Sequence, residues 1–463
     1  MGAPRIIGVI DIGKTNAKVA VVDLDTRSEI AVRKTPNVVS GDGPYPHFQV
    51  EALWDFICSA LAALNGAHPL DAISVTTHGA AAALIDAEGQ LALPVLDYEF
   101  AGPDALDADY AAVRPAFGES FTPPLPGGLN LGKQLFWQAR HFPREFARTR
   151  WILPYPQYWS FRLSGVASAE ITSLGCHTDL WDFGTAGYSS LVSSQGWRGK
   201  FPEVRPAFDT LGPVLPDLVL RLGLGPGMPV YSGIHDSNAS LLPHVLMRTP
   251  PYSVVSTGTW VIVCSPGGDL DHLNPARDSF ANIDALGHPV PSARFMGGRE
   301  FSLLIPEHAR PPAAAAGSSV LEQGIMLLPS VVNGSGPYPE RHAEWTVPPG
   351  SLGADTVQAA VSFYLALMTA ECLALTGAAG TTIIEGPFAE NALYVEMLGA
   401  ATGRPVISSR SGSTGTAVGA ALLADRSQHA PRVMVAAEPP QGSGETGERM
   451  AAYARRWRQA ASV

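Results

Sequence analysis

The sequence predicts an α/β protein built from two related halves. Near the N-terminus, the apolar run of residues 7–12 passes through a polar glycine turn into a second apolar run at residues 17–22, which closes on Asp23. Short runs rich in β-branched residues around such a turn are typical of a β-hairpin. The same pattern returns at residues 252–263 with a Thr-Gly-Thr turn. Because each hairpin begins a run of predicted strands and helices, we expect a duplicated architecture, although we find no strict sequence repeat.

The length and composition fit two globular domains. The chain has 463 residues, of which 46% are hydrophobic and 16% are charged, as in ordinary folded proteins. We place an N-terminal domain at residues 1–243 and a C-terminal domain at residues 244–463. The net charge of −11 and the single short basic run at residues 455–458 argue against nucleic acid or an anionic membrane as partner.

The cysteines and the N-terminus indicate a cytoplasmic protein. No two cysteines form a C-x-x-C pair, which leaves structural zinc unsupported and favours a reducing compartment. Asp11 and Lys14 interrupt the first apolar run, so we expect no signal core. We also expect no apolar run long enough to span a bilayer. The four cysteines are Cys58, Cys176, Cys264 and Cys372.

The turn of the first hairpin gathers groups suited to a phosphate. Gly13 lets the backbone bend tightly, and successive backbone N–H groups there can cradle an anion. Thr15 and Asn16 add donors, while Asp11 can hold a metal ion through water. An ordinary hairpin that begins Asp-x-Gly would look the same, so this turn alone leaves both interpretations open.

Between the hairpins, three stretches carry candidate functional residues. His78 follows a predicted buried strand, residues 72–77, directly into a glycine turn, and a structural histidine is an equal alternative. Asp97 and Glu99 close another apolar strand, where a solvated turn is the alternative. Asp236 falls at a strand-to-helix junction, either as an N-cap or as a carboxylate near the helix dipole.

Other segments predict helices and one linker. We expect the aromatic-rich residues 155–163 to form a helix whose aromatic side chains pack in the core, with a ligand platform as the alternative. The spacing over residues 356–376 predicts the longest amphipathic helix, and residues 412–421 predict a small-residue helix that can approach other backbone closely. The run from Pro311 to Ser319 is typical of a surface loop or linker.

These motifs, in this order, resemble the FGGY family of carbohydrate kinases within the actin-like ATPase superfold. Asp11-x-Gly13-x-Thr15-Asn16-x-Lys18 is similar to the family's first phosphate loop, and Thr257-Gly258-Thr259 to its second. Residues 385–391 resemble its adenosine turn, and Gly-x-x-Asp236 resembles the site of its catalytic base. The resemblance implies two ribonuclease H-like domains, each with a mixed five-stranded sheet, and an active site in the interdomain cleft.

The resemblance also implies ATP and Mg²⁺ as cofactors, with Mg²⁺ near Asp11, usually through water. The implied substrate is a small sugar, and a homodimer is compatible with the family. We expect sugar contacts from His78, Asp97, Glu99, Gln157 and Asp236, the last also acting as catalytic base. The residues implied in nucleotide binding are Asp11, Gly13, Lys14, Thr15, Asn16, Lys18, Thr257, Gly258, Thr259, Gly386, Pro387, Phe388 and Asn391.

The sequence departs from the family pattern at four places. Lys14 replaces the usual Thr and either adds charge at the phosphates or points to solvent. Glu385 stands where a second glycine is common, and Gln134 stands where the family's K-L-x-W lysine is expected. Residues 96–99 replace the usual W-x-D-x-R sugar motif. The motifs at residues 256–260 and 178–182 lean towards the rhamnulokinase and fuculokinase branch.

A cleft that offers histidine and carboxylates suits a neutral polyol, because an acidic sugar would want arginine. The sequence therefore predicts an ATP-dependent kinase for a neutral ketose, first a (6-deoxy-)L-ketose such as L-rhamnulose or L-fuculose. L-xylulose, D-xylulose, ribulose or a polyol are alternative substrates. Alternatives from other classes are an actin- or chaperone-type ATPase and a sugar sensor without catalysis.

Overall fold

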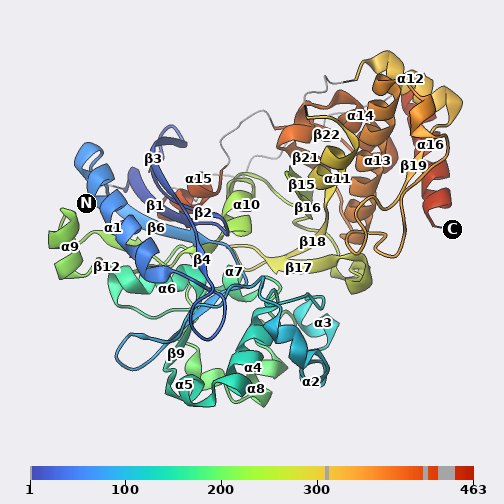
Figure 1. Cartoon of the computed structure of the whole chain (residues 1–463). Helices are drawn as coiled ribbons and strands as arrows, with labels where there is room; N and C mark the ends of the chain where they lie inside the picture. Colours follow the sequence, from blue (N-terminus) through green and yellow to red (C-terminus); the bar gives the residue numbers. More distant parts are fainter. Residues whose placement is uncertain (1–2, 308–311, 410–414, 426–443, 463) are drawn as a thin grey trace. The chain divides into compact units, whose positions relative to one another are not determined.

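The chain folds into two compact α/β units (Figure 1). The computed structural model describes residues 3–307, 312–409, 415–425 and 444–462. The first unit comprises the described residues up to Met247 together with 282–288 and 415–425, and the second comprises the remainder. The domain division at residues 243 and 244 stays a prediction. The compact units differ from it because two later segments return to the first unit.

The main sheet of the first unit has seven strands in the order β12-β13-β6-β1-β2-β3, with β14 also paired to β6. β1 pairs antiparallel with β2 and parallel with β6, and β14 also runs parallel to β6. The predicted first hairpin is thereby confirmed. The strands are β1 (Ile6–Ile12), β2 (Asn16–Asp23), β3 (Ser28–Pro36), β6 (Ala72–Thr77), β12 (Thr210–Pro213), β13 (Pro229–Tyr231) and β14 (Ile234–His235).

The second unit repeats this design. Its six-stranded sheet has the order β17-β18-β16-β15-β21-β22, in which β15 pairs antiparallel with β16 and parallel with β21. Five strands of each sheet thus share one order and one set of directions, as the duplicated architecture predicts, but both sheets exceed the expected five strands. The strands are β15 (Tyr252–Thr257), β16 (Val261–Cys264), β17 (Ser279–Ile283), β18 (Pro289–Phe295), β21 (Thr381–Glu385) and β22 (Val406–Ser408).

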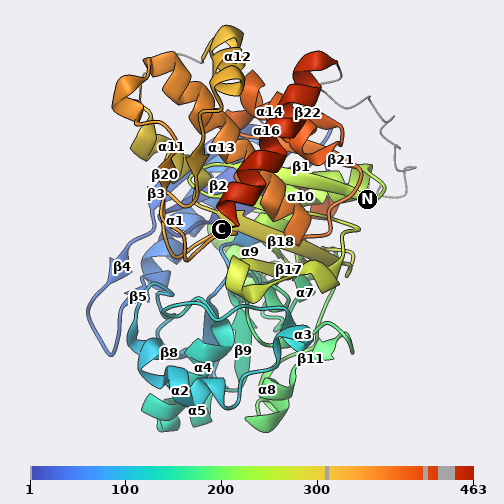
Figure 2. The ribbon, with the colours of Figure 1, turned by 90° about the vertical axis from the view of Figure 1, so that its right-hand side faces the viewer.

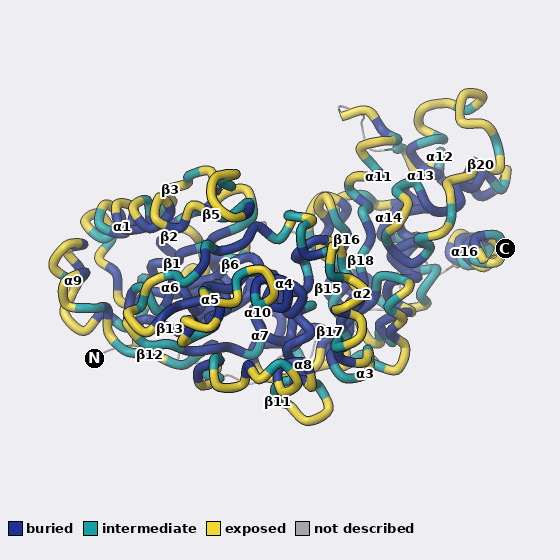
Figure 3. Tube along the Cα trace, turned by 60° about the horizontal axis from the view of Figure 1, so that its bottom comes forward, coloured by how far each residue is buried: buried dark blue, intermediate teal, exposed yellow. Residues whose placement is uncertain are grey.

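Helices cover both faces of the first sheet. Ile73 and Val75 on β6 pack in one apolar cluster with α1 (Val50–Ala67) and α6 (Tyr155–Ser164). Ser74, which points to the opposite face, donates from Oγ to the backbone oxygen of Ala420 on α15. The strands between these layers are therefore buried on both sides (Figure 3), and their ends present side chains to the site.

The small-residue helix α15 (Thr416–Ala421) lies against α10 (Asp236–Met247), as the sequence predicts. A Cβ added at Gly419 would lie 1.7 Å from the backbone oxygen of Ala239. Only glycine permits so close an approach. Residues 412–414 of the predicted helix lie outside the described residues.

The second unit is built around α13 (Ala354–Leu375), and α13, α14 (Ala392–Thr402) and α16 (Glu445–Ala461) lie side by side (Figures 1 and 2). The predicted helix is confirmed, but its single apolar face is wrong, since α13 is buried almost all round. The expectation of no membrane-length apolar run is also corrected. By length and composition alone, both α1 and α13 are long and apolar enough to cross a membrane. However, 44% of the most apolar 18-residue stretch of α1 and 89% of that of α13 are buried inside the structure.

The predicted linker at Pro311–Ser319 is wrong over its second half. Residues 314–319 belong to α12 (Ala314–Gln323), which packs on α13 through the buried Val320 and Leu321. Pro311 lies outside the described residues. Alanine is the strongest helix former, so a run of alanines supports a helix once an apolar face has a partner.

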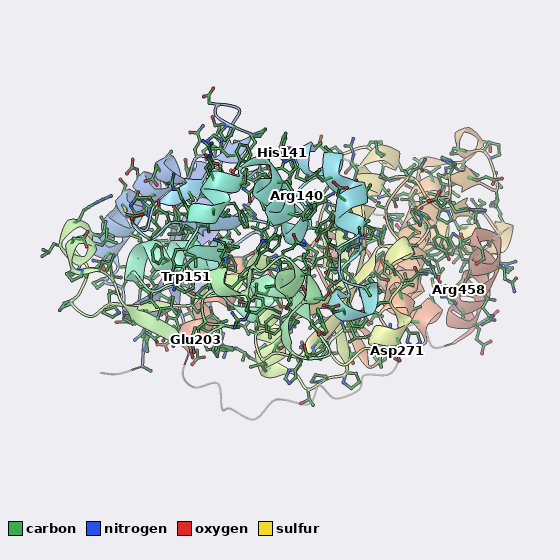
Figure 4. The ribbon with its side chains drawn as sticks, turned by 90° about the horizontal axis from the view of Figure 1, so that it is seen from below. Arg140, His141, Trp151, Glu203, Asp271 and Arg458 are labelled. Carbon is green, nitrogen blue, oxygen red and sulfur yellow. The ribbon has the colours of Figure 1, made fainter. Side chains whose placement is uncertain are left out.

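The first unit also carries a smaller sheet, β8-β7-β9, which packs with α4 (Leu131–His141) in one apolar cluster. Arg140 and His141 end α4, and Trp151 begins β9 (Figure 4). Leu96, the residue before Asp97, belongs to the same apolar cluster. The other elements are β4 (Val39–Ser40), β5 (His47–Phe48), β7 (Ala82–Ile85), β8 (Leu91–Leu93), β9 (Trp151–Pro154), β10 (Trp181–Asp182), β11 (Gly187–Tyr188), β19 (Leu327–Leu328), β20 (Glu344–Trp345), α2 (Asp107–Ala111), α3 (Phe117–Ser120), α5 (Pro143–Arg148), α7 (Ile171–Leu174), α8 (Ser190–Ser194), α9 (Pro216–Leu222) and α11 (Gly297–Leu304).

Candidate active site

Three parallel strands of the first unit end at one edge and carry acidic and imidazole side chains there. In register, Ile12 of β1 lies beside Thr77 of β6, and Thr77 lies beside His235 of β14. Asp11 therefore comes near the end of β1, while His78 and Asp236 directly follow the other two strands. Ligands of open α/β sheets bind at the carboxyl ends of such strands.

Asp236 begins α10 with its carboxylate still reachable. Its side chain is 33% exposed, and Oδ1 lies 3.2 Å from His235 Nε2. The backbone N–H of Ser237 donates to the same oxygen at 2.6 Å. Burial raises the pKa of Asp236, while His78 and the Ser237 hydrogen bond act to lower it. A carboxylate with a raised pKa is a better proton acceptor than an ordinary aspartate.

His78 is a neutral, oriented imidazole in an aromatic enclosure. Its ring lies 5.0 Å from that of Phe48, 5.1 Å from that of Tyr155 and 5.3 Å from that of Tyr98, between ring centroids. Nδ1 lies 2.8 Å from the backbone oxygen of Gly79, so it carries the proton. Burial lowers the pKa of His78 to about 4. Nε2 is therefore an acceptor, and it has no hydrogen-bond partner in the described structure.

Lys14 connects the first loop, residues 13–15, to Asp97 and Glu99, which are predicted to contact the sugar. Its Nζ forms a short ion pair with Asp97 Oδ1 and lies 3.3 Å from Glu99 Oε2. The same ammonium lies 5.1 Å from the ring centroid of Phe48 and 4.9 Å from that of Tyr98. Of the two alternatives that the sequence left open for Lys14, solvent exposure is wrong: the structure shows a mostly buried ion pair.

Two glutamines of the site act as anchors in this structure. Gln157 is fully buried, and its Nε2 donates to the backbone oxygens of Ser232 and Gly233 just before β14. Gln134, which stands where the family lysine is expected, donates to the backbone oxygens of Ala80 and Gly128. Contact between Gln157 and a sugar stays a prediction.

The first loop is closed by its own backbone. The N–H of Gly13 donates to the backbone oxygen of Asn16 at 2.9 Å, and Thr15 and Asn16 are exposed. Lys18 Nζ lies 2.6 Å from Glu29 and 3.5 Å from Asp11 Oδ2. The glycine amide is thus engaged in the turn, and the exposed donors are the hydroxyl of Thr15 and the amide of Asn16.

The donor set at this edge fits a hard divalent cation. Burial raises the pKa of Asp11 to about 6, Lys18 lowers it, and the negative charge of Asp236 raises it. Two carboxylates that disfavour each other's ionisation are stabilised by a cation such as Mg²⁺, which prefers oxygen ligands and keeps several waters. Asp11 is therefore compatible with the metal role that the resemblance implies.

In the second unit, the second loop (Thr257–Thr259) packs directly on the adenosine turn (residues 385–391). Thr257 Oγ1 donates to the backbone oxygen of Glu385 and accepts from the N–H of Phe388. Gly386 has φ +84°, and a Cβ there would lie 2.1 Å from the backbone oxygen of Thr257. The N–H of Gly258 donates to the oxygen of Trp260, a closing bond like that of the first loop.

The remaining adenosine-turn residues have structural contacts. Pro387 begins a 3₁₀ turn, and Phe388 is buried in the apolar core of the second unit. Asn391 caps α14 by accepting from the N–H of Tyr394 and donates to Ser362 Oγ. Their contacts with a nucleotide stay predictions.

Sequence reasoning missed two features of the site. The ion pair between Lys14 and Asp97 joins residues 83 positions apart, so no local pattern indicates it. The start of α11 touches the second loop, because a Cβ at Gly298 would lie 1.9 Å from the oxygen of Gly258. The Gly297-Gly298 pair after β18 is a sequence signal that could have pointed to this close approach.

Comparison with known proteins places the chain in a class. A family model described as carbohydrate kinase FGGY, C-terminal domain, matches residues 249–432. A carbohydrate kinase from Novosphingobium aromaticivorans is 34% identical, with a TM-score of 0.88, and the alignment covers 98% of this chain and 100% of that one. A xyloylose kinase from Brucella ovis, 19% identical with a TM-score of 0.78 over 99% and 98% of the two chains, shares the fold.

The two α/β units and the similarity to these kinases show that the chain has an actin-like kinase fold. This chain belongs to the FGGY family of carbohydrate kinases. Among curated proteins, L-fuculokinase of Salmonella typhi is 24% identical over 274 residues, and the match spans 58% of this chain and 57% of that protein's length.

Proposed function

We propose that this protein transfers the γ-phosphate of ATP to a hydroxyl group of a neutral sugar, with Asp236 as the catalytic base. The observation that carries the proposal is the meeting of Asp11, His78 and Asp236 at the carboxyl edge of three parallel strands, in a member of a carbohydrate kinase family. The cytoplasmic location and a homodimer remain part of the proposal.

In the proposed reaction, the sugar oxygen attacks the γ-phosphorus in line and the bond from that phosphorus to the ADP oxygen breaks. Asp236 takes the proton of the sugar hydroxyl. Because the transition state of phosphoryl transfer is loose, the proton can leave late. General-base help of this kind is worth about 10²–10⁴-fold, and positioning of the hydroxyl adds a larger share.

The nucleotide is assigned to loops in both units. The exposed donors of the first loop and Lys18 would contact phosphate, and Thr257, Gly258 and Thr259 would do so in the second unit. Gly386, Pro387, Phe388 and Asn391 would form the adenosine turn. When bound, Mg²⁺ would neutralise phosphate charge near Asp11.

The charges of the sugar side favour a neutral substrate. Asp97 and Glu99 neutralise Lys14, and Asp236 adds a further negative charge, so an acidic sugar would meet repulsion. The unpartnered Nε2 of His78 would accept a hydrogen bond from a sugar hydroxyl. Glu99 is exposed enough, at 66% of its side chain, to reach a ligand.

Within neutral sugars, we propose a (6-deoxy-)L-ketose such as L-fuculose or L-rhamnulose first. The support is the similarity to curated proteins named L-fuculokinase. L-xylulose, D-xylulose, ribulose and polyols are the alternatives, because one methyl group is worth only about 1–3 kcal/mol of discrimination.

The test is to measure phosphorylation of a panel of ketoses and polyols by the wild type and by the Asp236→Ala variant. A coupled assay that detects released ADP reports the rate. We expect kcat to fall by about 10²–10⁴-fold while the circular dichroism spectrum and the melting temperature stay near those of the wild type. Asp217→Ala, which removes an exposed carboxylate in the first turn of α9, is the matched control. Near-normal turnover by Asp236→Ala would refute the assignment of the base.

A further inference from the structure

One cluster in the first unit is not used by the proposed phosphoryl transfer. The side chains of Cys176, His177 and His235 each offer one ligand atom, and these atoms all lie within 4.8 Å of one another. Cys176 Sγ and His235 Nε2 are 3.7 Å apart. Cys176 and His235 are buried, with exposed fractions of 3% and 4%. A thiol and two imidazoles together are the donors that thiophilic divalent cations prefer.

The chain orients His177 as metal-binding histidines are oriented. Its Nδ1 lies 2.9 Å from the backbone oxygen of Leu129, and Asn130 Nδ2 donates to the His177 backbone oxygen at 3.2 Å. A backbone acceptor at Nδ1 fixes the proton there, so Nε2 carries the ring's lone pair, as in metal-binding histidines. His177 also adopts φ +42°, an uncommon backbone conformation for a histidine.

The Nε2 atoms of both imidazoles lie beside Gly79. A Cβ built at Gly79 would lie 2.7 Å from His235 Nε2 and 3.5 Å from His177 Nε2. Tetrahedral zinc with Zn–S of about 2.3 Å and Zn–N of about 2.0–2.1 Å requires S···N separations of about 3.6 Å. The observed 3.7 Å between Cys176 Sγ and His235 Nε2 matches this value closely.

The cluster also reaches the proposed base. Asp236 Oδ1 lies 3.2 Å from His235 Nε2, close to the separation of about 3.3 Å between neighbouring light-atom ligands of tetrahedral zinc. Asp236 lies outside the group whose ligand atoms all lie within 4.8 Å of one another, so a cation held by the thiol and the imidazoles would have to draw its carboxylate closer to gain it as fourth ligand. Mg²⁺ would not compete well for this donor set, because it prefers oxygen ligands in octahedral geometry.

We propose that Cys176, His177 and His235 form a binding site for a thiophilic divalent cation such as Zn²⁺, and that the bound cation recruits Asp236 and thereby inhibits phosphoryl transfer. The binding site stands on its own geometry, and only the inhibition rests on the proposed function. The ligated carboxylate cannot accept the proton of the sugar hydroxyl, so a cation bound at this site would inhibit the kinase.

Binding is tested with Co²⁺ on the full, metal-stripped protein in excess Mg²⁺. We expect a near-ultraviolet thiolate-to-cobalt charge-transfer band together with the visible bands of tetrahedral cobalt, and displacement of both by Zn²⁺. Cys176→Ser should abolish the charge-transfer band and weaken Zn²⁺ binding by about 10-fold or more. Cys58→Ser, which alters a buried thiol on α1, is the matched control and should leave both unchanged.

A charge-transfer band of wild-type strength in Cys176→Ser, or no such band in the wild type, would overturn the site. Should Cys176→Ser fold poorly, His177→Ala tests the same cluster through loss of the tetrahedral cobalt spectrum. An unchanged cobalt spectrum in His177→Ala would also refute the binding site.

The inhibition is tested by sugar phosphorylation at increasing Zn²⁺. We expect wild type to lose at least about 10-fold in rate over the concentrations that fill the cobalt-detected site, and Cys176→Ser to resist them. Equal inhibition of both proteins, or full activity of the zinc-loaded wild type, would refute inhibition through this site. If no sugar is phosphorylated in any condition, the proposed function fails, while the cobalt spectrum still decides the binding site.

Discussion

At the scale of single residues, the most informative departure from the family pattern is Lys14. It lies in a turn resembling a phosphate loop, yet its ammonium is paired with Asp97 and enclosed by Phe48 and Tyr98. A lysine committed to a buried carboxylate is a poor candidate for direct phosphate contact. We infer that it orders the sugar side of the site.

This inference predicts different effects on the two substrates. Lys14→Met leaves the carboxylate of Asp97 mostly buried without its partner, which costs about 1–3 kcal/mol. We expect KM for the sugar to rise by about tenfold while KM for ATP changes little, as measured by steady-state kinetics. Lys34→Met, at an exposed position of β3, is the control. A selective rise in KM for ATP would show instead that Lys14 serves the phosphates.

Glu170 predicts how the stability of the protein depends on pH. It is fully buried and caps α7 through the N–H groups of Thr172 and Ser173, and burial raises its pKa from 4.5 to about 7. Between these values the folded state holds a proton that the unfolded state releases. The contribution to the free energy of unfolding is therefore full below about pH 4.5 and is lost as pH rises through 7.

In Glu170→Gln this pH dependence should disappear. Relative to the variant, wild type should lose roughly 3 kcal/mol of unfolding free energy between pH 4.5 and 7.5, as measured by urea denaturation. Glu203→Gln, at an exposed position marked in Figure 4, should follow the wild-type curve. Parallel curves for wild type and Glu170→Gln would mean that Glu170 is ionised throughout.

At the scale of elements, the hairpin with its glycine turn is the unit that recurs. Both loops are closed by a glycine N–H that donates to a backbone oxygen two or three residues later. In the second unit, Gly386 then brings the adenosine turn against this loop at a separation that excludes any side chain. The geometry of the second loop therefore depends on a residue of another strand.

Gly386→Ala should disturb both stability and nucleotide affinity. Its Cβ would meet the Thr257 oxygen, and φ +84° is strained for alanine, so we expect a loss of about 1–3 kcal/mol in unfolding free energy. Affinity for ADP, measured by calorimetry, should fall as well. Gly403→Ala is the matched control, because Gly403 has φ +65° with open space around it. If the two variants bind ADP alike, the close approach has no bearing on the nucleotide.

The sequence predicts those elements whose signals are local. The hairpins, the strand before His78 and the small-residue helix all appear as apolar runs or glycine turns, and the structure confirms them. The burial of α13 on all sides and the helix α12 in an alanine-rich run depend on packing with distant elements. Likewise, the partner of Lys14 and the cluster of Cys176 with His235 join residues that are far apart in the chain, where no periodicity indicates contact.

At the scale of the whole molecule, the proposed kinase and an actin-type or chaperone-type ATPase share a fold, so the acceptor must distinguish them. We expect ADP release to require a sugar and to fall by about 100-fold or more without one, because an unpositioned water replaces an oriented hydroxyl. Asp217→Ala should show the same dependence. Equal ADP release with and without every sugar tested would favour the ATPase, and phosphosugar absent from the products would favour a sensor.

The return of α15 to the first unit has a consequence for synthesis of the chain. This helix supplies the backbone oxygen that pairs with Ser74 and the glycine that packs on Ala239, yet it follows Met247 by about 170 residues. At translation rates of about 5–20 residues per second, the first unit waits roughly 8 to 34 seconds on the ribosome before α15 can join α10 on this face of the sheet. During that interval the hydroxyl of Ser74 lacks the backbone oxygen of Ala420 with which it pairs in the folded chain.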